Sequence, residues 1–250
     1  MHSTQKVAVV TGAAHGIGRA IALRLARDGA SLCLMDRDID MLNRLGTEIG
    51  RSGAKVVTCE VDFLKPAQIE AAFVQTQAAF DRVDILVNNV GHSLREAMAP
   101  FEEVPVDAWD LMLDVCLKPA MACVRQLLPS MKRNRIGKIV NIGSDSAFVG
   151  PRANAPYAAA KAGIIGFSRA LAREVAPFGI NVNVVAPGYI RTRAMDAHSP
   201  EQLARIVGDT PLGIIGDPED VANAVAFFAS EQSRFVTGQT LIVNGGRWFN

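Results

Sequence analysis

Short apolar runs alternate with longer amphipathic segments along almost the whole chain. The runs expected to form strands are 7–10, 31–35, 55–59, 85–87, 138–141, 181–185 and 240–243. They are largely apolar along their length, which is typical of strands whose two faces are both covered by helices. Segments with helical periodicity lie between them, at 16–28, 39–50, 66–80, 107–131, 158–176 and 217–230. This alternation predicts an α/β fold with a doubly wound parallel sheet of about seven strands flanked by helices.

Composition favours one compact domain over residues 1–250. The chain has 49% hydrophobic and 20% charged residues and a net charge of only +1, which excludes a disordered chain and gives no electrostatic bias toward nucleic acid or an anionic membrane. No secretory leader and no membrane-spanning run is expected. The four cysteines form no disulfide-type spacing and the four histidines form no metal motif. We therefore expect a cytoplasmic protein with no metal, no nucleic-acid partner and no membrane partner.

The first expected strand runs directly into Thr11-Gly-Ala-Ala-His-Gly-Ile-Gly18, and a helical segment follows at once. In this context Gly12 permits a sharp turn, Gly16 permits backbone to approach a pyrophosphate, and Gly18 permits close packing of helix and strand. The helix N-terminus then offers free N–H groups to the anion. The turn predicts a Rossmann-type dinucleotide site.

The second expected strand ends at Asp36, where a carboxylate can accept hydrogen bonds from both hydroxyls of the adenosine ribose and would repel a 2′-phosphate. His15 and Arg37 could instead pair with such a phosphate. We therefore expect NAD as the cofactor in preference to NADP.

Tyr157 and Lys161 are spaced i, i+4 on an expected helix, so their side chains lie on one face. A free tyrosine titrates near 10, too high for a general base at neutral pH, and a neighbouring ammonium is expected to lower that pKa. Ser144 follows the expected strand at 138–141, at the sheet edge where ligands bind, and its hydroxyl can hydrogen-bond a carbonyl or an alcohol. Ser146 is a competing candidate on the residues alone.

Taken together, the chain resembles the short-chain dehydrogenase/reductase family over essentially its full length. The matching elements, in order, are Thr11-Gly-x3-Gly-Ile-Gly18, Asn88-Asn-Val-Gly91, Ser144, Tyr157-x3-Lys161, Pro187-Gly188 and Val243-Asn-Gly-Gly246. The family's serine stands thirteen residues before its tyrosine, which selects Ser144 over Ser146. The resemblance implies that Tyr157 transfers the alcohol proton, Ser144 orients the substrate oxygen, and Lys161 holds the cofactor ribose.

The resemblance also implies the remaining site residues. Residues 1–140 would form the cofactor-binding half and residues 141–250 the catalytic and substrate-binding half. The expected cofactor contacts are Gly12, His15, Gly16, Ile17, Gly18, Asp36, Arg37, Asp62, Phe63, Asn89, Gly91, Tyr157, Lys161, Pro187, Gly188, Ile190 and Thr192. The expected substrate contacts are Ser144, His92, Arg152, Asn154 and Tyr157. Arg152, Arg191 and Arg193 could clamp an acidic group of the substrate, or could be solvated.

One departure from the family pattern is Cys116, which stands where members usually carry an asparagine that helps hold a water beside the active-site lysine. Cysteine cannot hydrogen-bond comparably, so the proton relay is expected to be altered.

The sequence around Tyr157 and at 181–188 looks much like the β-ketoacyl carrier-protein reductases. Three positions argue against that activity. Those enzymes typically have Arg in place of His15, lack an acid at Asp36 and use NADPH, and carry a basic residue in place of Phe178.

We therefore expect an NAD(H)-dependent oxidoreductase that interconverts a secondary alcohol and a ketone. The alternatives are a 3-oxoacyl thioester reductase and, less favoured, a non-catalytic dinucleotide-binding protein. By resemblance the chain is also expected to form a homotetramer.

Overall fold

The computed structural model describes residues 5–94, 98–196 and 198–249 of the chain. Residues 1–4, on which the expectation of no leader partly rests, lie outside the described residues. None of the described helices is both long enough and apolar enough to cross a membrane.

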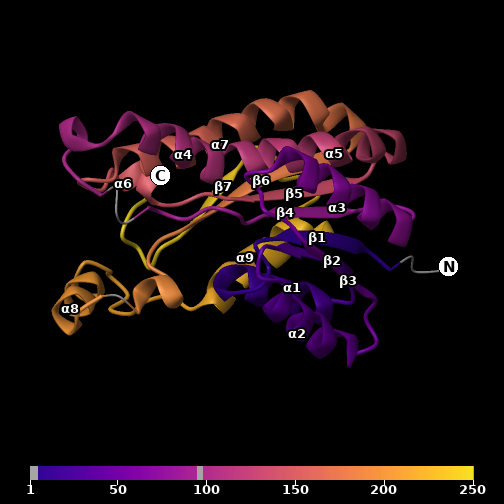
Figure 1. Ribbon diagram of the computed structural model, residues 1–250, viewed down its shortest axis with the longest axis horizontal. Helices are drawn as coiled ribbons and strands as arrows, with labels where there is room; N and C mark the ends of the chain where they lie inside the picture. The colour runs from indigo at the N-terminus through magenta and orange to yellow at the C-terminus, as the bar shows by residue number, and fades with distance from the viewer. Residues whose placement is uncertain (1–4, 95–97, 197, 250) are drawn as a thin grey trace.

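A single parallel sheet forms the centre of the molecule (Figure 1), and its strand order is β3-β2-β1-β4-β5-β6-β7. Every strand pair in it is parallel. The strands are β1 (Val7–Thr11), β2 (Ser31–Asp36), β3 (Val56–Glu60), β4 (Ile85–Asn88), β5 (Gly137–Ile142), β6 (Ile180–Pro187) and β7 (Thr240–Val243). The predicted doubly wound fold is confirmed.

Helices cover both faces of the sheet (Figure 1). One face carries α1 (Gly16–Arg27), α2 (Ile39–Gly50) and α9 (Pro218–Ala229). The other carries α3 (Pro66–Ala79), α4 (Val106–Cys116), α5 (Lys118–Asn134) and α7 (Ala155–Val175). The alternation of side chains along each strand divides the core accordingly: Ala8 and Val10 belong to the cluster under α1 and α9, and Val7 and Val9 to the cluster under α5 and α7.

The structure differs from the predicted elements in two places. The helix expected over 107–131 is two helices: Leu117 departs from the regular helix (φ −116°), and Pro119, near the start of the second helix, has no N–H with which to continue the hydrogen bonds of the first. A short helix, α8 (Pro200–Gly208), lies between β6 and α9, where no helix was predicted. It is nine residues long and buries only Ile206, so it offers a short and weak signal in the sequence.

The strand order reverses direction at β1: the chain runs outward to β2 and β3, then returns to place β4 on the other side of β1. In an open α/β sheet the crevice at such a point, beyond the carboxyl ends of the strands, binds ligands. The loops that follow β1, β4, β5 and β6 therefore converge on one edge of the sheet. A four-residue helix, α6 (Ser146–Val149), follows β5 at that edge.

Candidate active site

The turn between β1 and α1 has the conformation that its glycines predict. Gly12 and Gly16 have φ values of +63° and +50°, a region that favours glycine. A Cβ added to Gly18 would lie 2.0 Å from the carbonyl oxygen of Gly12, so helix and turn touch as closely as expected. Asn89, the residue after β4, holds this turn in place, because its side-chain Nδ2 donates to the Gly12 carbonyl oxygen at 2.9 Å.

Beside this turn is a cavity of about 500 Å³. Eight of the expected cofactor residues line it: Gly12, His15, Asp36, Arg37, Asp62, Phe63, Asn89 and Gly91. The carboxylate of Asp36 is held at the end of β2 by two backbone donors: Ala14 N–H reaches Oδ2 at 3.0 Å, and Asp38 N–H reaches Oδ1 at 3.1 Å. The site therefore places a fixed negative charge at the cavity wall.

Sequence reasoning missed Asp38, which also lines this cavity. Its Oδ2 lies 2.6 Å from Nε2 of His15. That contact, reinforced by the Met41 backbone N–H, holds the pKa of Asp38 below its ordinary value. The ring of His15 is thus already partnered by a carboxylate. The sequence did offer a signal for Asp38: it stands at the N-cap of α2, where its side chain accepts a hydrogen bond from the Met41 backbone N–H.

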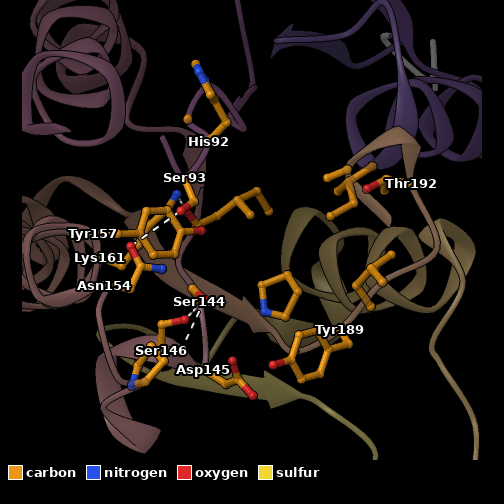
Figure 2. Close-up of a pocket in the computed structure, with 18 of the residues that line it drawn as sticks. His92, Ser93, Ser144, Asp145, Ser146, Asn154, Tyr157, Lys161, Tyr189 and Thr192 are labelled. Carbon is orange, nitrogen blue, oxygen red and sulfur yellow. Dashed lines mark hydrogen bonds between the residues drawn. The ribbon is translucent and has the colours of Figure 1, made fainter. Parts of the chain in front are cut away.

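A second cavity, of about 520 Å³, lies beyond the carboxyl ends of β4, β5 and β6. Asn89, Gly91 and His92 line both cavities, so the two adjoin. The structure brings the three expected catalytic residues together here: Figure 2 shows Ser144 and Tyr157 facing the open space, with Lys161 beside Tyr157 and Thr192 on the opposite wall. Ile17, Pro187, Gly188 and Ile190 also line this cavity, as expected of cofactor contacts.

Tyr157 lies in the first turns of α7, with its ring packed against the apolar cluster of Met112, Val115, Cys116 and Ala160. Burial raises the pKa of its phenol well above the ordinary value, and a hydrogen bond with Ser144 opposes that rise. The Ser144 hydroxyl also donates to Ser146 Oγ at 3.1 Å and accepts from the Ser146 backbone N–H at 3.1 Å. Ser144 thus connects Tyr157 to the start of α6.

Lys161 is buried, with 2% of its surface exposed, and donates from Nζ to the carbonyl oxygen of Ile142 at 2.9 Å. Burial lowers its pKa. In this structure the cost of burying a phenolate dominates the phenol pKa of Tyr157, so the expected lowering by the Lys161 ammonium together with an oxidised nicotinamide stays a prediction. The Lys161 ammonium lies over the tyrosine ring and is directed to a backbone carbonyl.

Cys116 ends α4 and is buried beside the active-site lysine. A Cβ added to Gly91 would lie 3.1 Å from Lys161 Nζ and 3.3 Å from Cys116 Sγ, which places all three residues around one point. The thiol contacts the His92 carbonyl oxygen at 3.4 Å. Burial raises the thiol pKa, and this argues against a reactive thiolate.

The structure places only some of the expected substrate residues at the second cavity. His92 and Asn154 line the second cavity, where Asn154 Oδ1 accepts from Ser93 Oγ at 3.4 Å (Figure 2). Arg152 is exposed and does not line it. Arg191 pairs with Asp217, and Arg193 lines the first cavity, beside the glycine turn, instead.

The lining residues that escaped sequence reasoning include Asp145 and Arg247. Asp145 directly follows Ser144, which was a usable signal. Tyr189, the first residue after Gly188, also lines this cavity. Arg247 is brought in from the far end of the chain by the fold alone. Among the described residues, no group of three or more His, Cys, Asp or Glu side chains is placed to hold a metal ion.

Comparison with known proteins agrees with this geometry. A family model described as enoyl-(acyl carrier protein) reductase matches residues 12–247. The 3-oxoacyl-[acyl-carrier-protein] reductase of Escherichia coli is 40% identical over 248 residues, covering 99% of both chains. A (2S)-[(R)-hydroxy(phenyl)methyl]succinyl-CoA dehydrogenase subunit of Thauera aromatica is 38% identical, covering 97% of this chain and 96% of its own.

Among solved structures, a putative gluconate dehydrogenase of Agrobacterium tumefaciens matches with a TM-score of 0.92 and 33% identity, covering 97% of this chain and 95% of its own. The family model and the full-length relatives lead to one conclusion: the chain belongs to the short-chain dehydrogenase/reductase family, a family of oxidoreductases that act on CH–OH and keto groups.

Proposed function

We propose that the protein is an NAD(H)-dependent oxidoreductase that interconverts a secondary alcohol and a ketone. The observation that carries the proposal is the adjacency of the two cavities. One is walled by the carboxylate of Asp36, and the other holds Ser144, Tyr157 and Lys161 around one open space.

The residues present fit a dinucleotide. The turn requires glycine at both positions: Gly12 and Gly16 have φ values that other residues rarely adopt, and an added Cβ would lie 3.0 Å from Asn89 Nδ2 at Gly12 and 3.1 Å from the Thr192 side chain at Gly16. The N-terminus of α1, which follows the turn, would offer its free N–H groups to a pyrophosphate. Asp36 would accept hydrogen bonds from the adenosine ribose hydroxyls, and Lys161 would hold the nicotinamide ribose. When bound, the cofactor supplies the hydride acceptor or donor.

The chain's own residues supply the proton chemistry. The phenolate of Tyr157 takes the alcohol proton during oxidation, and the neutral phenol donates a proton to the ketone oxygen during reduction. Ser144 holds the substrate oxygen next to that phenol by hydrogen bonding. Lys161, buried next to the ring, contributes a positive charge that favours the ionised phenol once the positive charge of an oxidised nicotinamide adds to it.

The cofactor preference is tested with Asp36→Asn, which removes the charge and keeps an acceptor for one of the two backbone N–H groups, Ala14 or Asp38, that bind the carboxylate. We expect the wild-type protein to favour NAD. In the variant the ratio of kcat/KM for NADP to that for NAD should rise by about ten- to a hundredfold, because a 2′-phosphate no longer meets a carboxylate. Asp40→Asn, an exposed carboxylate on α2 outside the cavity lining, is the matched control. A wild-type preference for NADP, or an unchanged ratio in Asp36→Asn, would refute the assignment.

A second candidate is a 3-oxoacyl thioester reductase, favoured by two full-length relatives whose names specify acyl-carrier-protein or CoA thioesters. Phe178, where a basic residue would favour a carrier protein, is partly buried and lies under Lys132 Nζ at 5.1 Å from its ring centroid. Assaying secondary alcohols, hydroxy acids and 3-oxoacyl thioesters with both cofactors separates the candidates. Cofactor binding with no hydride transfer to any of them would favour the non-catalytic alternative.

We also propose that the protein is a cytoplasmic homotetramer whose chain is one domain, with residues 1–140 mainly binding cofactor and 141–250 mainly shaping the substrate site. Exposed apolar residues support association: Leu111 is 38% exposed, Trp248 43% and Phe249 77%. Two other apolar residues of the long helices, Val115 and Leu171, are buried in the core of the subunit and do not add to this exposed surface. The four free cysteines are compatible with a reducing compartment. A monomer by light scattering would contradict the assembly.

A further inference from the structure

Arg247 enters the substrate cavity from the end of the chain because the segment after β7 turns sharply. Gly245 and Gly246 have φ values of +66° and +87°, and Gly246 N–H donates to the Asn244 side chain at 3.1 Å. These two left-handed residues reverse the chain so that Arg247 lines the cavity that also contains Ser144 and Tyr157.

Two contacts fix the guanidinium in place. Nη1 donates to Asp145 Oδ2 at 3.0 Å, within an ion pair whose side chains are 17% and 4% exposed. The guanidinium carbon lies 4.6 Å from the centroid of the Tyr189 ring, which supplies a cation–π contact. Figure 2 shows Asp145 and Tyr189 next to each other beyond Ser144, at the opposite end of the site from His92.

These contacts leave most of the guanidinium's hydrogen-bonding capacity unused. Arginine has five N–H donors, and within the described part of the chain neither Nε nor Nη2 of Arg247 makes a hydrogen bond. The planar arrangement of such donors matches carboxylate and phosphate oxygens. Because Asp145 and Tyr189 already hold the guanidinium in place, binding a ligand to it would cost little further side-chain entropy of Arg247.

The charge of the cavity favours an anion. Among its described lining residues, Asp145 is the only carboxylate, and two cationic side chains, Lys161 and Arg247, also line it. Because Asp145 is paired with Arg247, no unpaired carboxylate among these residues faces a bound anion.

We propose that Arg247 is the specificity-determining residue of this site, and that it binds an oxyanion group of the substrate separated from the reacting carbon by a short chain. The proposal rests on the proposed function, since it names the substrate class of that reaction. The oxyanion can be the carboxylate of a short hydroxy or oxo acid, or the phosphate of a pantetheine thioester arm.

Binding to the NAD-loaded protein, measured by calorimetry, tests the proposal without turnover. The first arm compares glutarate with glutaramide, an uncharged molecule of the same length. The second compares 4′-phosphopantetheine with pantetheine. We expect the wild-type protein to bind the charged member of at least one pair roughly ten- to a hundredfold more tightly. The arm that shows the preference identifies the source of the oxyanion.

Arg247→Met should abolish this preference and leave the uncharged member bound as before, and Arg247→Lys should retain part of it. Because Arg247→Met leaves Asp145 buried without its partner, the double variant Asp145→Asn/Arg247→Met, which removes both charges, keeps the test interpretable if the single variant is unstable. Equal binding within both pairs in the wild-type protein, or an unchanged preference in the variants, would overturn the proposal. Failure of the proposed function would instead appear as absence of hydride transfer from any alcohol with either cofactor.

Discussion

The ammonium nitrogen of Lys161 lies 5.8 Å from the centroid of the Tyr157 ring, so the cation sits over the ring while the phenol itself is governed by burial. A buried phenol resists ionisation, which has opposite consequences for the two reaction directions. Oxidation of an alcohol needs the phenolate as base, and reduction of a ketone needs the neutral phenol as acid.

Because the phenol pKa of Tyr157 is raised, the two reaction directions should depend on pH differently. At saturating NAD, kcat/KM for alcohol oxidation should rise through neutral pH, by up to about tenfold per unit, because the raised pKa of Tyr157 keeps the ionised fraction small. Ketone reduction should be nearly flat over the same range. Ser144→Ala removes the hydrogen bond that lowers the phenol pKa, so the rise should move to higher pH. An oxidation profile that is already level below neutral pH would contradict the prediction.

Tyr157→Phe should reduce turnover by at least about 10²- to 10⁴-fold, since it deletes the group that transfers the proton. The ring is held in place by Met112, Val115, Cys116 and Ala160, contacts that phenylalanine retains, so the fold and the affinity for NAD should be unchanged. Single-turnover hydride transfer followed by NADH absorbance, with NAD affinity measured by titration, checks both halves. Turnover that persists in a folded, NAD-binding variant would remove Tyr157 from the mechanism.

The glycine turn offers a test of packing. In Gly18→Ala the new methyl group would meet the Gly12 carbonyl oxygen and, at 2.6 Å, the Asn89 side chain. We expect overpacking to cost about 1–3 kcal/mol of unfolding free energy and to displace the turn, weakening NAD binding. Gly50→Ala, at the end of α2 with nothing within 4 Å of the added atom, is the matched control and should be neutral or slightly stabilising. Chemical denaturation and NAD titration of both variants decide; equal behaviour would show that Gly18 is not a close-packing position.

The sequence was sufficient for the fold and for the residues whose roles depend on local pattern. Each strand is a short apolar run, as expected of a strand whose two faces are both covered by helices. Gly12, Asp36 and Ser144 lie at or just after strand ends, and Tyr157 lies on a helix, so their positions along the chain determine where they lie in the fold. The break at Leu117 could not be found from periodicity, because apolar residues continue across it at helical spacing on both sides.

Arginine placement illustrates what the sequence could not provide. Arg152 is near Tyr157 in the chain, yet its side chain is exposed, whereas Arg247 is distant in the chain and lines the cavity. The difference depends on where β7 ends relative to β6 and on two consecutive left-handed glycines. The pKa of Tyr157 likewise depended on how deeply the phenol is packed, a property of tertiary structure that i, i+4 spacing does not report.

The departure from the family pattern at Cys116 gives the last prediction. In Cys116→Asn the amide would lie beside Lys161 and could still donate to the His92 carbonyl, and its additional donor and acceptor can hold a water near the lysine. Turnover should therefore be retained or rise. Cys116→Ala is the control: it removes the thiol contact and leaves a small void, so it should lower the unfolding free energy by about 1 kcal/mol without restoring a hydrogen-bonding group. Steady-state kcat and thermal unfolding of the three proteins compare these effects. A large loss of kcat in a stably folded Cys116→Asn variant would show that the thiol, in spite of its burial, is itself required for proton transfer to and from Tyr157.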